Sequence, residues 1–138
     1  MDREKLVELL NGDLELEFRS IVQSTQHAAT VKGVEFQPIA DKIRPHLRQE
    51  LEHATVLAEQ IDFLGGEPTT HVPEVPNQTE PRRALSLDLE LEERQLAAYR
   101  ERFEQAEELG LPDVAEALRP LIEQTQDHVR DLRGALGE

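Results

Sequence analysis

The chain repeats itself at a shift of 75 residues, and this repeat is the strongest constraint on its fold. The pentapeptide Asp13 to Glu17 recurs unchanged as Asp88 to Glu92. In the second part of each half, Arg44-Pro45 recurs as Arg119-Pro120. Agreement over such a distance predicts two related halves, arranged about a pseudo-twofold axis, that bury a shared core.

Each half contains two stretches in which apolar residues recur three and four positions apart, the spacing of one helix face. Glycines at 33, 65, 66 and 110 follow the first three stretches and are typical of helix ends. Pro45 lies inside the second stretch and should bend it or interrupt its hydrogen bonding. We expect helices over Asp2–Val31, Phe36–Leu64, Arg82–Leu109 and Pro112–Leu136.

Between the second and third predicted helices lies a long polar connection, Glu67–Pro81, which holds four of the eight prolines. The other two connections are short, so each half is a helical hairpin. The long connection can join distant helix ends. We therefore expect an all-α four-helix bundle, in which a long crossover joins two hairpins, as a single domain over residues 1–138.

Composition narrows the possible functions. With 38% hydrophobic and 32% charged residues, the chain suits a helical globular protein. The absence of cysteine excludes thiolate metal sites and disulfides. A net charge of −14 disfavours nucleic acid and anionic membrane surfaces as partners but suits cations. No apolar run approaches the roughly 20 residues of a membrane span. The N-terminus shows no signal-peptide pattern, so we expect a cytoplasmic location.

Three glutamates, Glu17, Glu50 and Glu92, fall inside otherwise apolar stripes. A carboxylate buried alone is strongly destabilising, so each needs a compensating partner. Glu50 is followed one helical turn later by His53 on the same face. Two explanations of this Glu-x-x-His pattern are open. In a chain this rich in charge the usual one is a solvated or salt-bridged helix face, and the second is a metal site.

The repeat favours the metal. Under the pseudo-twofold axis Glu17 faces Glu92, and His53 faces His128. One glutamate from each of two helices, with Glu-x-x-His on the other two, is the di-iron carboxylate plan. Such cations take carboxylate oxygens and imidazole nitrogens as ligands. The predicted metal ligands are Glu17, Glu50, His53, Glu92 and His128.

Thr125 breaks the symmetry, because the repeat calls for a glutamate there. Glu123 and Asp127 cannot replace it, since each lies two residues away, about 200° around a helix. The sequence thus supplies five ligands instead of six. We expect the metal next to His128 to be held less tightly, or by extra water.

We expect structural or solvent-facing roles for several other polar residues. Tyr99 is expected to pack in the core more than to take part in redox chemistry. Asp13 and Asp88 lie one turn before ligand glutamates and could orient the ligand imidazoles, with helix capping or solvation as alternatives. We expect His46 and His71 to face solvent.

Three segments carry a family resemblance. They are the first-helix pattern Leu10-Asn11, Glu17, Gln23 and His27-Ala28, the second-helix run Glu50–Ala54 with its ending Ile61–Pro68, and the third-helix run Asp88–Glu92. They resemble the ferritin-like superfamily, nearest to bacterioferritin and rubrerythrin-type bundles.

This resemblance implies iron as the metal, a di-iron centre at the five named ligands with its second site weakened, and oxidation of ferrous iron by O2 or peroxide. It also implies a homodimer or higher homo-oligomer. The family's haem methionine corresponds to Leu51, and the one methionine is Met1, so no haem is expected. The family's short fifth helix has no counterpart before Glu138, which argues against a hollow storage shell without deciding the oligomeric state.

Two alternatives to an iron-oxidising protein remain open. In the first, Thr125 leaves a protein that binds metal without catalysis. In the second, the chain is a helical interaction module that keeps the bundle but not the chemistry.

Overall fold

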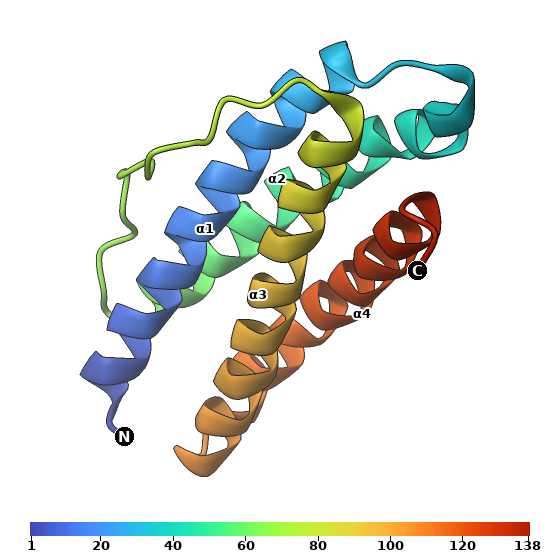
Figure 1. Ribbon diagram of the computed structural model, residues 1–138. Helices are drawn as coiled ribbons and strands as arrows, with labels where there is room; N and C mark the ends of the chain where they lie inside the picture. The colour runs from blue at the N-terminus through green and yellow to red at the C-terminus, as the bar shows by residue number, and fades with distance from the viewer.

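A computed structural model describes residues 1–138 as four α-helices without a β-strand (Figure 1). A short 3-10 turn, η1 (Val34–Phe36), precedes the second helix. None of the helices combines the length and apolarity that a membrane span requires. The helices are α1 (Arg3–Thr30), α2 (Gln37–Phe63), α3 (Pro81–Glu108) and α4 (Pro112–Ala135), each end within one residue of its predicted position.

Local signals account for these ends. The side chain of Asp2 accepts a hydrogen bond from the backbone N–H of Lys5 at 2.8 Å and caps α1. Gly65 follows α2 at a φ of 87°, a left-handed conformation that glycine adopts without strain. Pro45 does not interrupt α2, which is helical throughout from Gln37 to Phe63.

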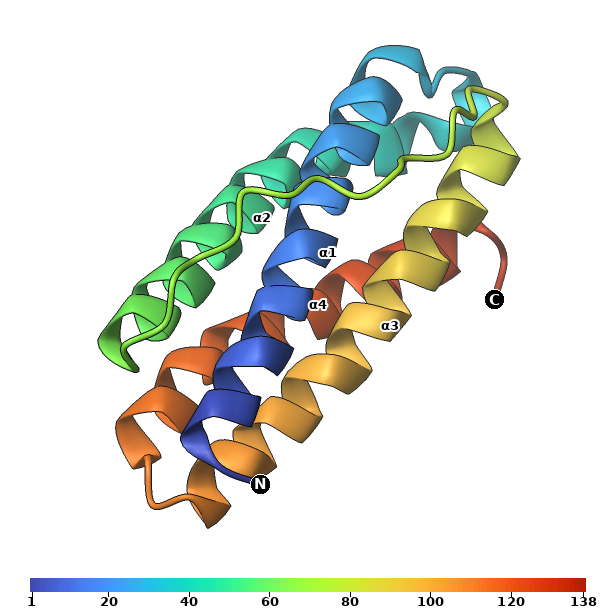
Figure 2. The same ribbon diagram turned by 90° about the vertical axis from the view of Figure 1, so that its left-hand side faces the viewer.

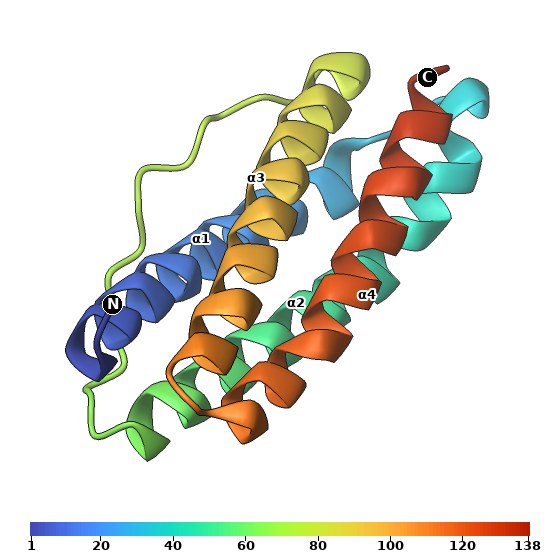
Figure 3. The same ribbon diagram turned by 90° about the horizontal axis from the view of Figure 1, so that it is seen from below.

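The predicted bundle of two hairpins is confirmed. α1 packs against α2 and α3, and α4 packs against α3 and α2 (Figures 1 and 3). The crossover between α2 and α3 runs along α1 from one end of the bundle to the other (Figure 2). Asn11 of α1 donates to the carbonyl of Glu67 at 3.1 Å and accepts from the N–H of Thr69 at 2.8 Å. Further along, Gln26 donates to Asn77 at 2.6 Å.

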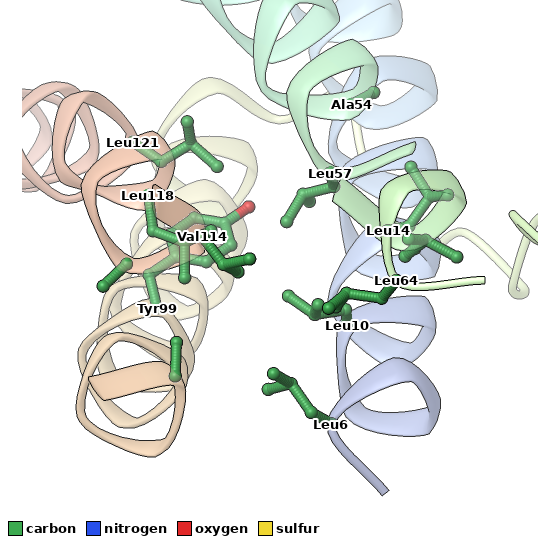
Figure 4. Packing of buried hydrophobic residues seen from close by; sticks show 13 residues of the cluster. Leu6, Leu10, Leu14, Ala54, Leu57, Leu64, Tyr99, Val114, Leu118 and Leu121 are labelled. Atoms are coloured by element: carbon green, nitrogen blue, oxygen red, sulfur yellow. The ribbon is translucent and has the colours of Figure 1, made fainter. Parts of the chain in front are cut away.

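The apolar core is divided into two clusters, and each draws on all four helices. The first includes Leu10, Leu57 and Leu118, and Figure 4 shows its side chains from the two hairpins facing one another. The second includes Ile43 and Leu132 at the opposite end of the helices. Along α1, α2 and α4 the buried residues between the two clusters are largely polar, and on α3 the polar Glu92 and Gln95 lie between Leu89 and Leu96 of the second cluster. We call this stretch the polar layer; its buried members are Glu17, Ser20, Gln23, Ser24, His27, His46, Glu50, His53, Glu92, Gln95, Thr125 and His128.

Candidate metal centre

All five predicted ligands lie in the polar layer, and each is at most 4% exposed. α1 contributes Glu17, α2 contributes Glu50 and His53, α3 contributes Glu92, and α4 contributes His128. Each helix turns its polar positions inward because they continue the apolar stripe above and below them. The structure therefore brings together side chains that the sequence spreads over more than a hundred residues.

Two imidazole–carboxylate pairs form the sides of the centre. Nδ1 of His53 lies 3.3 Å from Oε1 of Glu17, and Nδ1 of His128 lies 3.3 Å from Oε1 of Glu92. The first pair joins the helices of one hairpin and the second joins those of the other. The two rings are nearly parallel, with their centroids 6.2 Å apart. This geometry is the pseudo-twofold relationship that the repeat predicted.

A glutamine from the opposite hairpin orients each imidazole. Nε2 of His53 lies 2.8 Å from Oε1 of Gln124, and Nε2 of His128 lies 2.6 Å from Oε1 of Gln49. An amide oxygen only accepts, so Nε2 carries the hydrogen in both rings. In a neutral ring Nδ1 then presents its lone pair to the carboxylate. Two electron-rich atoms facing each other in a dry interior need a proton or a cation between them.

Glu50 lies between the two pairs. Its carboxylate, that of Glu92 and the ring of His128 offer ligand atoms within 4.8 Å of one another. Burial, followed by the charge of Glu92, raises the pKa of Glu50 well above its ordinary value. Burial raises the pKa of Glu92 to about 8, against the lowering effect of its hydrogen bond with Glu50. In the absence of metal, the carboxyl group of Glu92 is therefore largely protonated at neutral pH.

The pKa values of the two histidines are shifted in opposite directions. Burial lowers the pKa of His128 to about 4, and the nearby His53 lowers it further. Burial also works against the charged form of His53, but the hydrogen bond and charge of Glu17 outweigh it and raise the pKa. In the metal-free centre His53 thus holds a proton more readily than His128 does.

Tyr99 belongs to both the core and the centre. It is fully buried in the first apolar cluster, as predicted, and its hydroxyl donates to Glu17 (Figure 4 shows the ring). Its ring meets His53 edge to face at a centroid distance of 6.4 Å. Burial, then the charge of Glu17, raises the pKa of Tyr99 well above its ordinary value. The neutral phenol acts as a hydrogen-bond donor that holds Glu17 in place.

His46 was expected to face solvent, and that expectation is wrong. Its ring is buried and stacks on His128 with a centroid distance of 3.9 Å. Nε2 of His46 lies 3.0 Å from Oδ2 of Asp131 on α4. Burial lowers its pKa to about 4, so the ring is neutral and apolar enough to stack. His71, by contrast, is exposed as predicted.

Asp13 and Asp88 do not orient the ligand imidazoles. Asp13 accepts from Nε of Arg102 at 2.9 Å, and Asp88 lies 2.8 Å from Nδ1 of His27. Gln23 also donates to Asp88 at 2.8 Å. Asp13 and Asp88 occupy equivalent positions in the repeat, as do His27 and Arg102. The two buried pairs therefore fasten α1 to α3 symmetrically, beyond the metal centre.

Several buried polar atoms of the layer have no hydrogen-bond partner. They are Oε2 of Glu17, Oε2 of Glu50, the hydroxyl of Thr125 and both amide atoms of Gln95. Buried polar atoms are nearly always satisfied, so this concentration calls for an additional group. Three carboxylates and two imidazoles form a donor set that suits a pair of divalent transition-metal ions. The residues present thus fit a metal centre.

Sequence reasoning missed three of these participants, Gln49, Gln124 and Gln95. The first two occupy equivalent positions in the repeat and immediately precede Glu50 and Thr125. That equivalence was a usable signal. Gln95 has no equivalent glutamine, because its counterpart in the first half is Ser20.

Comparisons with known proteins agree with this architecture. The sequence pattern of the ferritin family, described as the ferritin-like domain, matches residues 7–138. The chain therefore belongs to the ferritin-like family. It is 28% identical to a bacterioferritin from Desulfovibrio desulfuricans over 127 residues, which are 91% of this chain and 70% of that protein.

A solved structure is similar over nearly the whole chain. The crystal structure of a ferritin-like, diiron-carboxylate protein from Bacillus anthracis is 31% identical in sequence and has a TM-score of 0.90. The alignment covers 99% of each chain. The ferritin-like bundle that the sequence predicted is confirmed at the level of both family and fold.

Proposed function

We propose that this protein binds a pair of iron ions in the polar layer and oxidises ferrous iron. The observation that carries the proposal is the set of five buried ligands Glu17, Glu50, His53, Glu92 and His128, two of whose carboxylate oxygens have no partner. The similarity to a diiron-carboxylate protein and to a bacterioferritin supports iron as the metal.

Iron is here the substrate, and the proposed reaction is balanced by O2 or peroxide. Each ferrous ion gives up one electron and becomes ferric. With O2, a pair of ferrous ions supplies two electrons, and with two protons the product is hydrogen peroxide. One peroxide takes two electrons and two protons to give two waters, so a pair of ferrous ions reduces it completely. The chain supplies the anionic ligands, which favour the ferric product, and a largely apolar surround that excludes bulk water.

The test is an anaerobic ferrous titration followed by exposure to O2 or to peroxide. We expect two irons per chain, and a ferric absorption band after the oxidant is added. The Glu50→Gln variant removes one carboxylate at nearly constant volume and should reduce the stoichiometry. Failure of the wild-type chain to take up any iron would overturn the proposal and leave the interaction-module alternative.

A non-catalytic metal-binding protein is the second candidate, and Thr125 is the observation that favours it. The sequence was expected to weaken the metal next to His128, but Glu50 and Glu92 both group with His128, so a threonine at position 125 leaves the His53 half, with Glu17, short of anionic ligands. The same titration separates the candidates, because this one predicts binding of iron, at one ion per chain, without oxidation.

We further propose that the chain forms a homodimer through α1 and α2. An apolar groove between these helices is lined by Phe18, Ile21, Leu51 and Ala58, and the side chain of Leu51 is half exposed. Sedimentation at micromolar concentration tests this, since a Leu51→Glu change should give monomers. The cytoplasmic location and the single-domain organisation stay predictions.

A further inference from the structure

Gln95 and Thr125 together occupy the place that Ser20 and Glu50 occupy in the other half. The repeat relates Ser20 on α1 to Gln95 on α3, and Glu50 on α2 to Thr125 on α4. Ser20 is within hydrogen-bonding reach of Glu50, the carboxyl group whose pKa is raised chiefly by burial. The pseudo-twofold relationship therefore places Gln95 beside Thr125. Each half pairs a small residue with a large one. In the first half the large residue is on the second helix of the hairpin, and in the second half it is on the first helix of the hairpin.

Gln95 is an unusual glutamine. It lies one turn after Glu92 on α3 and is 1% exposed. Both its amide oxygen and its amide nitrogen lack a hydrogen-bond partner, and so does the hydroxyl of Thr125. A long, flexible polar side chain is disfavoured in such a position unless something there binds it. No such cost attaches to leucine, which has almost the same volume.

We propose that Gln95 is a metal ligand, and that its amide oxygen substitutes for the glutamate missing at position 125. The inference rests on the proposed iron centre. Glu50 groups with Glu92 and His128, so the repeat places position 125 with Glu17 and His53. The oxygen binds the metal ion that those two residues hold. An amide oxygen is a hard, neutral donor, so it restores the number of ligands without restoring the charge. The ion next to His53 is therefore the more weakly held of the two.

The amide oxygen also explains why the substitution at 125 can coexist with an intact centre. Thr125 alone would leave a void, and a void in the interior costs packing. Gln95 fills this space from α3. The bulk of the missing side chain is restored along with a donor atom, and the apolar clusters on either side keep their separation.

The test uses Co²⁺ as a spectroscopic probe under anaerobic conditions, so that its readout does not depend on oxidation. We compare the wild-type chain with Gln95→Leu, following the visible absorption of bound Co²⁺ as the metal is titrated. The wild-type chain should bind two ions. Gln95→Leu should weaken the second ion about 10- to 100-fold and leave the first within twofold.

Stability of the metal-free chain provides the readout that a structural role would not share. If Gln95 is kept for the metal, Gln95→Leu should raise the melting temperature of the metal-free protein, because two unsatisfied buried atoms are removed. The rise in melting temperature on adding Co²⁺ should become smaller. The matched control is Gln126→Leu, an exposed glutamine of α4, which should change neither quantity.

A second variant guards against misfolding. Gln95→Glu returns a carboxylate to the centre and should tighten the second ion while altering its absorption spectrum. Two ions bound by Gln95→Leu with wild-type affinities would overturn the role of Gln95, and leave the iron centre intact. A wild-type chain that binds neither Co²⁺ nor Fe²⁺ would overturn the proposed function itself.

Discussion

Gln49 of α2 accepts a hydrogen bond of 2.6 Å from His128 of α4, and so reaches across from one half of the repeat to the other. Its equivalent, Gln124, does the same for His53 in the reverse direction. Each hairpin thus orients the imidazole of its partner hairpin. The centre is consequently a property of the assembled bundle, because neither hairpin alone can hold its histidine in the metal-binding tautomer.

The Gln49→Leu change should therefore weaken metal binding at His128. Without an acceptor at Nε2, the ring is free to place its hydrogen on Nδ1, where the metal must bind. We expect a loss of about 10- to 100-fold in affinity for one of the two ions, as for other residues that position a metal ligand. Calorimetric titration with Co²⁺ measures it. Gln126→Leu serves as the control, and equal affinities in the two variants would contradict the prediction.

Thr125→Glu and Gln95→Ser should compensate for each other. Thr125→Glu alone places a long side chain beside Gln95, and such overpacking costs about 1–3 kcal/mol. The double variant rebuilds the Ser20–Glu50 arrangement in the second half. We expect it to unfold at higher denaturant than Thr125→Glu and to bind the second ion more tightly than wild type.

A double-mutant cycle decides this case. Residues in contact show coupling of about 0.5–3 kcal/mol, whereas independent sites add within about 0.3–0.5 kcal/mol. Additive free energies of unfolding would mean that positions 95 and 125 do not meet. Denaturation of the metal-free variants gives the four values.

The metal-free protein should become less stable as the pH rises from 6.5 to 8. Burial raises the pKa of Glu92 to about 8 and that of Asp13 to about 7, from ordinary values of 4.5 and 3.8. Folded chains thus keep protons that unfolded chains have lost, and stability falls with pH wherever this holds. His53, whose pKa is raised, acts in the same direction. Below pH 6.5 the lowered pKa values of His46 and His128 act in the opposite direction.

Thermal unfolding at several pH values, with a chelator present, checks the sign. A melting temperature that is flat or rising between pH 6.5 and 8 would contradict the assignment of protons to the centre. Saturating metal should reverse the slope, because the ion displaces these protons. Calorimetry in buffers of different ionisation enthalpy should then detect proton release at pH 7.

Arg102→Met should be strongly destabilising. Arg102 makes a buried ion pair with Asp13, with nitrogen and oxygen 2.9 Å apart. Removing one partner of such a pair leaves an uncompensated buried charge and typically costs about 3–5 kcal/mol. Chemical denaturation near pH 8, where Asp13 is ionised, measures the loss.

Two further variants interpret that loss. Arg130→Met removes an exposed arginine from the same bundle and should cost less than about 1 kcal/mol. The double variant Asp13→Leu/Arg102→Met should recover much of the stability, because no unpaired charge remains. If the double variant is no more stable than Arg102→Met, the burial of charge is not the cause.

The helices, and the burial of the five expected ligands in one layer, were predictable because they depend on local spacing and on a repeat. Glu17 and Glu92 stand in identical pentapeptides, and apolar residues three and four apart define the face on which both lie. His46 was not predictable in the same way. Its burial depends on Asp131 and His128, which are far away in sequence and lie on another helix.

A role for Gln95 at the centre was not predictable from the sequence for a different physical reason. An amide is a common surface group, and nothing in its own surroundings in the sequence distinguishes it from Gln105 or Gln126. The role proposed for Gln95 can be inferred only when positions 20, 50, 95 and 125 are compared together. The large and the small residue exchange helices between the two hairpins, and no single helix shows this. Asp13 and Asp88 likewise required knowledge of which helices meet, because the partner of Asp13 lies on α3 and the partners of Asp88 lie on α1.

The polar layer gives the bundle an unusual distribution of rigidity. Two dry blocks rich in leucine, isoleucine and valine hold the helices at either end, and the buried side chains of the polar layer between them are carboxylates, amides, imidazoles and hydroxyls. In the metal-free chain, backbone amides of these middle turns should exchange with deuterium sooner than those within the blocks. Binding of the proposed metal ions would then join the four helices at mid-bundle, so that metal binding and the loss of flexibility there occur together.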